Sequence, residues 1–221
     1  MKKLVLSVMA VAAFGFAANA QEKEKPTYGF QESNVFVEGS FSISDSNVKM
    51  TGTDTKVKTT TFEVNPKVGY MLNDKFAVGA SVGFGKLGLD NELFDGAFDG
   101  VDADYIKSTY AGVFARYYFL EVGQRFKTFA EVGVGFSEGK MDVSGVSNKA
   151  TGIRAGLDLG FNYFLTQNLA VSFNVANVFS YANYNVKEDG KKTNTVSNTN
   201  ANVNIFNNFF DNAKFGLTYK F

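Results

Sequence analysis

Hydrophobic and polar residues alternate along most of this chain, and residues 151–164 show the pattern most clearly. Apolar side chains occupy every second position from Ile153 to Tyr163, and the positions between them carry glycines, Arg154, Asp158 and Asn162. Because side chains on a β-strand alternate between its two faces, this stretch predicts a strand with one fully apolar face. The opposite face is small and sparsely charged, which favours a narrow polar interior over a surface washed by water.

The same alternation recurs along the chain, and we predict eight strands from it. They cover residues 34–44, 60–72, 76–85, 106–119, 126–138, 151–164, 169–181 and 213–221. Asn177 interrupts the apolar face of the seventh segment, where we predict a β-bulge. Three connections are short (73–75, 120–125 and 165–168) and four are long (45–59, 86–105, 139–150 and 182–203). Together these features predict an all-β fold, a closed antiparallel eight-stranded transmembrane β-barrel.

The first 33 residues do not share this pattern. Residues 1–20 combine Lys2 and Lys3, a short apolar run and the small-residue ending Ala18-Asn19-Ala20, which predicts a cleaved signal peptide. The apolar run is too short for a helix that spans a bilayer, which needs about 20 residues. Residues 21–33 are charged and contain Pro26, so we expect a flexible segment before a barrel domain at 34–221.

Several stretches together resemble the small outer-membrane barrels of the OmpA-like transmembrane class, the outer membrane protein β-barrel domain family. They are the leader, Val64–Tyr70, Arg116–Phe119, Gly152–Phe164 and Phe215–Phe221. The resemblance implies an integral protein of the outer membrane of a diderm bacterium, with outer-membrane lipids and lipopolysaccharide around it. It also implies that Tyr219 and Phe221 form the signal that the barrel-assembly machinery reads. Family members that tether the envelope carry a further peptidoglycan-binding domain, and we do not expect that role here.

Six charged residues fall on the predicted polar face, and they are the candidate site of this chain: Glu63, Lys67, Arg116, Glu131, Arg154 and Asp158. Counting from the turn near Gly123 places Arg116 opposite Glu131, and counting from the next loop places Glu131 level with Asp158. Since unpaired charge in a confined interior is costly, we predict that these groups pair and plug the lumen. The alternative is a gate, in which exchange of partners opens a narrow path for ions or small solutes.

Composition excludes several classes of function. The chain contains no His, so a hydrolase with a Ser/His/acid site is excluded, and no Cys, so thiolate metal sites and disulfides are excluded. Without the leader the net charge is −2, which gives no reason to expect nucleic-acid binding. The motif Gly83-Phe-Gly85-Lys-Leu-Gly88 leads into a loop and not a helix, so we expect neither a nucleotide site nor another cofactor.

Two polar loops remain as candidate surfaces. Residues 90–104 carry six carboxylates, which we expect to be a solvated loop and not a metal site, although divalent cations bridging to lipid headgroups are an alternative. Residues 183–208 are rich in Asn, Thr and Lys and suit an adaptable surface for an external ligand. We therefore predict a non-enzymatic envelope protein with a structural or surface-recognition role such as adhesion. The alternatives are the narrow gated pore and a secreted, soluble lipocalin-like barrel with an apolar interior.

Overall fold

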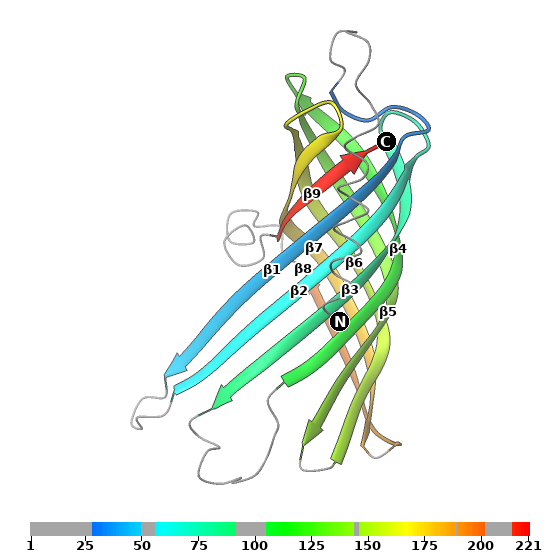
Figure 1. Ribbon diagram of the computed structural model, residues 1–221. Helices are drawn as coiled ribbons and strands as arrows, with labels where there is room; N and C mark the ends of the chain where they lie inside the picture. The colour runs from blue at the N-terminus through cyan, green and yellow to red at the C-terminus, as the bar shows by residue number, and fades with distance from the viewer. Residues whose placement is uncertain (1–27, 50–55, 92–104, 144–145, 189, 202–213) are drawn as a thin grey trace.

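The computed structural model describes residues 28–49, 56–91, 105–143, 146–188, 190–201 and 214–221. Its described residues form one antiparallel sheet that curls into a barrel of strongly tilted strands (Figure 1). The strands are β1 (Val35–Lys49), β2 (Lys56–Met71), β3 (Phe76–Asn91), β4 (Tyr105–Val122), β5 (Phe126–Val143), β6 (Val146–Phe164), β7 (Leu169–Glu188), β8 (Lys191–Ala201) and β9 (Lys214–Lys220). In this part of the chain, no helix is long and apolar enough to cross a membrane.

The predicted closed eight-stranded barrel is confirmed. Strands β1 to β7 pair in chain order, and β9 closes the ring by pairing with both β7 and β1. Strand β9 pairs with the first part of β7, at Leu169–Asn174, whereas β8 pairs with its second part, at Phe179–Glu188. Strands β8 and β9 therefore occupy successive parts of the same eighth position in the wall.

Strand β8 corrects one prediction, because the connection expected at 182–203 contains the end of β7 and the whole of β8. The connection expected at 139–150 is also mostly strand, since β5 runs to Val143 and β6 begins at Val146. Strand β8 is rich in Thr, Asn, Ser and Lys and has no apolar face. A strand that meets water on both faces lacks the alternation from which strands are predicted.

The apolar faces point outward. Large hydrophobic side chains on strands β1 to β7 and on β9 are exposed, among them Phe41, Phe84, Val132, Phe136 and Leu217. On this outer face, four rings form a ladder across neighbouring strands, with centroid separations of 4.6 Å for Phe126–Phe161, 4.6 Å for Phe161–Phe173 and 5.2 Å for Phe173–Phe215. The lipocalin-like alternative required the apolar faces to point inward, so the structure contradicts it.

The predicted irregularity at Asn177 is also confirmed. The register between β6 and β7 shifts on both sides of this residue, between Leu157 and Asp158 and again between Leu159 and Gly160. The shifts turn Asn177 to the interior, where its side-chain amide donates to Asp158 at 2.8 Å. A bulge thus converts an interruption of the apolar face into an inward polar contact.

Short turns close one end of the barrel, at the top of Figure 1, and side chains at these turns hold them. The Asn73 side-chain oxygen accepts hydrogen bonds from the backbone N–H groups of Lys75 and Phe76, both at 2.9 Å. Gly123 adopts a φ of +62°, which favours glycine, at the turn between β4 and β5. At this end the chain reverses within a few residues, so the register of each pair is fixed locally.

Candidate functional site, a charged layer and the cavity above it

Four charged side chains from four strands meet inside the barrel and are buried there: Glu38 on β1, Lys67 on β2, Arg116 on β4 and Glu131 on β5. The Arg116 guanidinium forms a two-bond fork with Glu38, at 2.8 Å for Nη1–Oε2 and 2.9 Å for Nη2–Oε1. Its Nε and Nη2 also lie 2.7 and 2.6 Å from Oε2 of Glu131. Lys67 pairs with Glu131 and approaches Glu38 to 3.9 Å. Two cations therefore balance two carboxylates in the lumen, and we call these four residues the charge quartet.

Aromatic rings surround the centre of the quartet. The guanidinium carbon of Arg116, whose side chain is 0% exposed, lies 4.0 Å from the ring centroid of Phe129. It lies 5.4 Å from the centroid of Phe36 and 5.7 Å from that of Phe114. Ring faces carry partial negative charge, so these rings stabilise the cation while excluding water from its hydrogen bonds.

A second set of polar side chains extends the layer to β6, β7 and β9. Glu38 Oε2 accepts hydrogen bonds from Thr218 at 2.9 Å and from Ser172 at 3.3 Å. Asn162 donates to Ser172 at 2.7 Å and accepts from the Tyr118 hydroxyl at 3.1 Å. Each buried polar group in this set thus has a partner, as burial away from water requires.

Between this layer and the short turns, the interior is filled by an apolar cluster. It consists of Phe30, Phe36, Met71, Ala77, Phe114, Tyr118, Phe129, Phe164 and Ala170. Phe30 comes from the segment before β1, and its ring lies 4.9 Å from Tyr118 and 5.2 Å from both Phe36 and Phe164. Phe164, at the end of β6, is fully buried in this cluster.

The segment from Tyr28 to Asn34 lies across the mouth at the short-turn end. Arg125 donates to the Tyr28 hydroxyl at 2.6 Å, and Lys220 donates to the carbonyl of Gly29 at 2.6 Å. Gly29 has a φ of +99°, and a Cβ atom there would lie 2.6 Å from the Lys127 side chain, so the position requires glycine. We expected residues 21–33 to be flexible; the part from Tyr28 is instead packed, and residues 21–27 lie outside the described chain.

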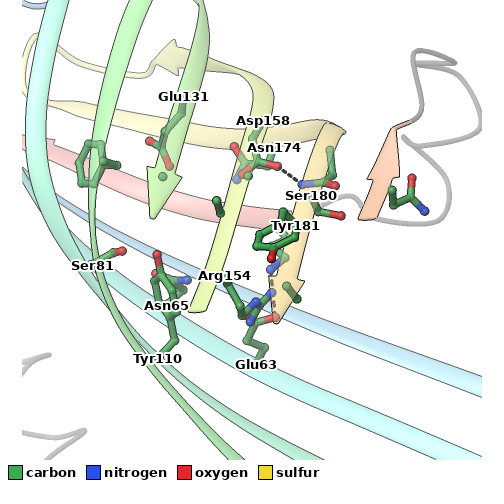
Figure 2. Close-up of a pocket in the computed structure, with 18 of the residues that line it drawn as sticks. Glu63, Asn65, Ser81, Tyr110, Glu131, Arg154, Asp158, Asn174, Ser180 and Tyr181 are labelled. Atoms are coloured by element: carbon green, nitrogen blue, oxygen red, sulfur yellow. Dashed lines mark hydrogen bonds and ion pairs between the residues drawn. The ribbon is translucent and has the colours of Figure 1, made fainter. Parts of the chain in front are cut away.

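On the other side of the quartet, the interior widens into a cavity of about 820 Å³. Lys67 and Glu131 form its floor, and Tyr184, Asn198 and Asn200 line it towards the end with the long strand extensions. Figure 2 shows Glu63, Asn65, Ser81, Tyr110, Glu131, Arg154 and Asp158 around this space. The lumen is therefore a polar chamber closed at the quartet.

The structure brings three of the six predicted site residues into one cluster. The register places Arg116 opposite Glu131 and Glu131 opposite Asp158, the pairing expected from the sequence. Lys67 joins Arg116 and Glu131.

The other three line the cavity separately. Glu63 pairs with Lys214 at 2.9 Å, and Asp158 binds Asn177. Arg154 forms no hydrogen bond or ion pair within the described residues, and its guanidinium carbon lies 5.8 Å from the Tyr110 ring centroid.

Glu38, which the sequence prediction omitted, is the most connected carboxylate of the layer. One signal was available, because Glu38 is the acidic residue on the polar face of the first predicted strand, where it would need a cation. Its partner Arg116 lies three strands away, and strand pairing alone does not place them together.

The remaining candidates are placed as follows. Tyr219 lies near the end of β9 and Phe221 directly follows the strand, with ring centroids 4.9 Å apart. The leader at 1–20 and most of the acidic stretch at 90–104 lie outside the described residues. Within the described chain, no group of three or more His, Cys, Asp or Glu side chains is arranged to hold a metal ion.

Comparison with known proteins gives a family and distant structural relatives. The sequence model of the family described as "Outer membrane protein beta-barrel domain" matches residues 7–221. The outer membrane protein OprG from Pseudomonas aeruginosa is similar at 19% identity, over 87% of this chain and 98% of its own, with a TM-score of 0.49. Neisserial surface protein A (NspA) is similar at 18% identity, over 86% and 100%, with a TM-score of 0.49. Ail of Yersinia pestis is similar at 15% identity, over 86% and 100%, with a TM-score of 0.45. No curated protein matches the chain by sequence.

Proposed function

Because the chain belongs to the outer membrane protein beta-barrel domain family, we propose that it is a plugged, non-enzymatic barrel of the outer membrane of a diderm bacterium. Its role is to hold the long-loop end outside the cell as a structural and recognition surface. In barrels of this type the short turns face the periplasm and the long loops face outward. The observation that carries the proposal is the closure of the lumen by the charge quartet and the aromatic cluster beneath it.

The two layers oppose conduction for different reasons. An ion that crosses the quartet must separate buried, hydrogen-bonded charges, which costs several kcal/mol per broken pair. It must then pass Phe30, Phe36 and Phe164, which offer no polar partner in place of water. The interior of an eight-stranded barrel is just wide enough for side chains to fill it, so these layers leave little room.

The same contacts support a role without catalysis. A general acid or base needs a carboxyl group that is free to exchange its proton near neutral pH. Glu38 is held by Arg116, and Glu131 is held by Arg116 and Lys67. The chain contains no His that could act beside them.

A narrow gated pore is the second candidate, and the position of Lys67 favours it. The Lys67 ammonium pairs with Glu131, has Glu38 within 3.9 Å and borders the cavity. A shift of Lys67 between these carboxylates is an exchange of partners, the step that a gate requires. In this function the Tyr28–Asn34 segment must also leave the mouth.

Single-channel conductance in planar bilayers tests the two functions. The wild type is compared with Glu131→Ala, which removes one carboxylate of the quartet, and with the control Glu138→Ala, whose carboxylate pairs with Lys140 and Lys149. The plugged scaffold predicts a silent wild type, a silent control and a leaky Glu131→Ala. Conductance steps in the wild type that change with Glu131 would overturn it in favour of the pore.

The proposal also assigns partners. Outer-membrane lipids and lipopolysaccharide contact the apolar outer face, and the assembly machinery reads the last strand with Tyr219 and Phe221. A ligand outside the cell contacts the long-loop end, and nucleic acid is not a partner.

A further inference from the structure

On one wall of the cavity, an aromatic side chain lies beside glycines. Tyr110 lies on the inner face of β4, beside a patch of glycines on β4 and β5. A Cβ atom at Gly112 would lie 2.2 Å from the Tyr110 hydroxyl oxygen, and one at Gly135 would lie 2.8 Å from its ring. Glycine at these two positions therefore lets the Tyr110 ring lie against the wall. Tyr110 borders the cavity, and the Arg154 guanidinium lies over its ring.

Among the described residues that line the cavity, Arg154 is the cation that forms no ion pair or hydrogen bond, although Glu63 lies near enough for the two charges to interact. The other lining charges have partners, since Lys67 pairs with Glu131 and Lys214 pairs with Glu63. Asp158 accepts a hydrogen bond from Asn177. Arg154 has no such partner among the described residues, and its guanidinium lies 5.8 Å from the Tyr110 ring centroid. Its five N–H donors form a planar fork that matches a carboxylate.

Amide groups complete the lining around this pair. Asn65, Asn174, Asn198 and Asn200 border the cavity from β2, β7 and β8. The side-chain oxygen of Asn65 is buried and has no hydrogen-bond partner. A buried acceptor without a donor is costly, so this oxygen is free to accept a hydrogen bond from a water or from a hydroxyl or N–H group of a ligand in the cavity.

We infer that this cavity is a binding site for a small acidic saccharide, a molecule of one or two hydroxyl-rich rings with one carboxylate. The face of a sugar ring presents C–H groups, which pack on the negative face of an aromatic ring such as Tyr110. The carboxylate pairs with Arg154, and hydroxyl groups donate to Asn65 and to the other amides. At about 820 Å³, the cavity is within the range of ligand sites. The inference rests on the proposed function, since it assigns a ligand class to the outward-facing half.

Calorimetric titration of the detergent-folded barrel tests the site with a matched pair of probes. One probe is a glucose disaccharide, and the other is the same disaccharide with a carboxylate in place of one hydroxymethyl group. We expect the acidic probe to bind the wild type 10- to 100-fold more tightly than the neutral one, since a charge-assisted contact is gained. Arg154→Gln removes that preference, and Tyr110→Leu weakens binding of both probes.

Lys149→Gln is the matched control, because Lys149 is a cation on the same strand that pairs with Glu138 and does not line the cavity. The site is supported if Lys149→Gln binds the acidic probe with wild-type affinity and Arg154→Gln no longer prefers the acidic probe to the neutral one. Absence of saturable binding to the wild type, or equal preference in Arg154→Gln, overturns it.

Two further measurements separate the possible failures. Titration with a polysaccharide of the same acidic units distinguishes a free sugar from the end of a surface glycan. A long chain that binds only through its end offers few binding ends per unit mass, so its stoichiometry reveals that mode of binding. Conductance of the same preparation separates the two proposals. A silent barrel without sugar binding refutes the saccharide site alone, whereas an open barrel refutes the plugged scaffold.

Discussion

Arg116 and Glu38 are 78 residues apart in the chain, yet their side chains form a two-bond fork inside the barrel, with donor–acceptor distances of 2.8 and 2.9 Å. The fork joins β1 to β4 across the lumen, with β2 and β3 between them in the wall. Because Glu38 also accepts from Thr218 and Arg116 also binds Glu131, the fork links the two halves of the polar layer. This contact therefore holds together the polar layer that fills this part of the lumen.

Arg116→Met should destabilise the barrel strongly, because it leaves Glu38 and Glu131 with Lys67 as their shared cation. Breaking a buried ion pair by removing one partner costs about 3–5 kcal/mol. The free energy of unfolding can be measured by urea titration of the protein in lipid vesicles, followed by the gel mobility of unheated samples. Glu138→Gln, which alters a partly exposed ion pair, should leave the unfolding midpoint unaltered.

A double variant distinguishes charge imbalance from lost packing. Arg116→Met with Glu131→Gln leaves one cation, Lys67, beside one carboxylate, Glu38, so we expect it to be more stable than Arg116→Met alone. If both variants have the same unfolding free energy, the cost of Arg116→Met comes from packing and the role assigned to the quartet is wrong.

The sequence predicted the pairing of Arg116 with Glu131 because a tight turn connects their strands. A register set by a short turn can be counted along the chain. Counting from the centre of the connection expected at 139–150 placed Asp158 level with Glu131. Glu38 was missed because its approach to Arg116 depends on the curvature and stagger of the whole closed sheet, which no local pattern encodes.

The other differences have equally local causes. Strand β8 was taken for a loop because its Thr and Asn residues face water on both sides and show no alternation. Phe30 was assigned to a flexible segment because a single aromatic after a charged, proline-containing stretch carries no periodicity. Its burial depends on the aromatic pocket that the strands of the barrel form around it.

Phe30→Ala should loosen the mouth of the barrel. Truncation of a buried Phe costs about 3–5 kcal/mol in a packed core, and we expect the lower end because the segment can detach while the strands stay paired. Hydrogen exchange should then accelerate at the amides of Ser33 and Asn34, which bond to the carbonyls of Met71 and Gln31. Glu32→Ala is the control in the same segment, and equal exchange rates in the two variants would refute the role of the ring as an anchor.

Gly135→Ala and Gly133→Ala should have different effects on the free energy of unfolding, although both add one methyl group to the inner face of β5. At Gly135 the new Cβ would lie 2.4 Å from the Ala111 carbonyl oxygen and 2.5 Å from the Gly112 Cα, so backbone must move. At Gly133 the nearest atom is 3.7 Å away, an ordinary contact. We expect Gly135→Ala to lower the unfolding free energy by about 1–3 kcal/mol and Gly133→Ala to change it little. Equal effects would show that the glycine wall is not closely packed.

Hydrogen exchange also tests strand β8. If residues 191–201 pair with β7, the backbone amides that form hydrogen bonds between β7 and β8 should exchange more slowly than those of an unstructured loop. Neither residue of the opposed pair Tyr184 and Val196 belongs to the ion-pair network, so Val196→Pro removes a backbone donor without altering the network. We expect faster exchange along β8 in this variant and an unchanged unfolding midpoint, because β9 closes the barrel independently. Unprotected amides in the wild type would contradict the strand.

Val132→Arg tests which face of the wall meets lipid. Val132 is 55% exposed on the outer face of β5, next to the inward-facing Glu131, and lies near the middle of the strand. A lipid-facing Arg near the bilayer midplane costs about 2–4 kcal/mol, so this variant should fold less stably in vesicles, whereas Val132→Leu should match the wild type. In a water-soluble barrel the same Arg would sit on a solvated surface at almost no cost. Equal stability of Val132→Arg and Val132→Leu in vesicles would therefore argue against membrane insertion, and a loss confined to Val132→Arg would support it independently of any sequence similarity.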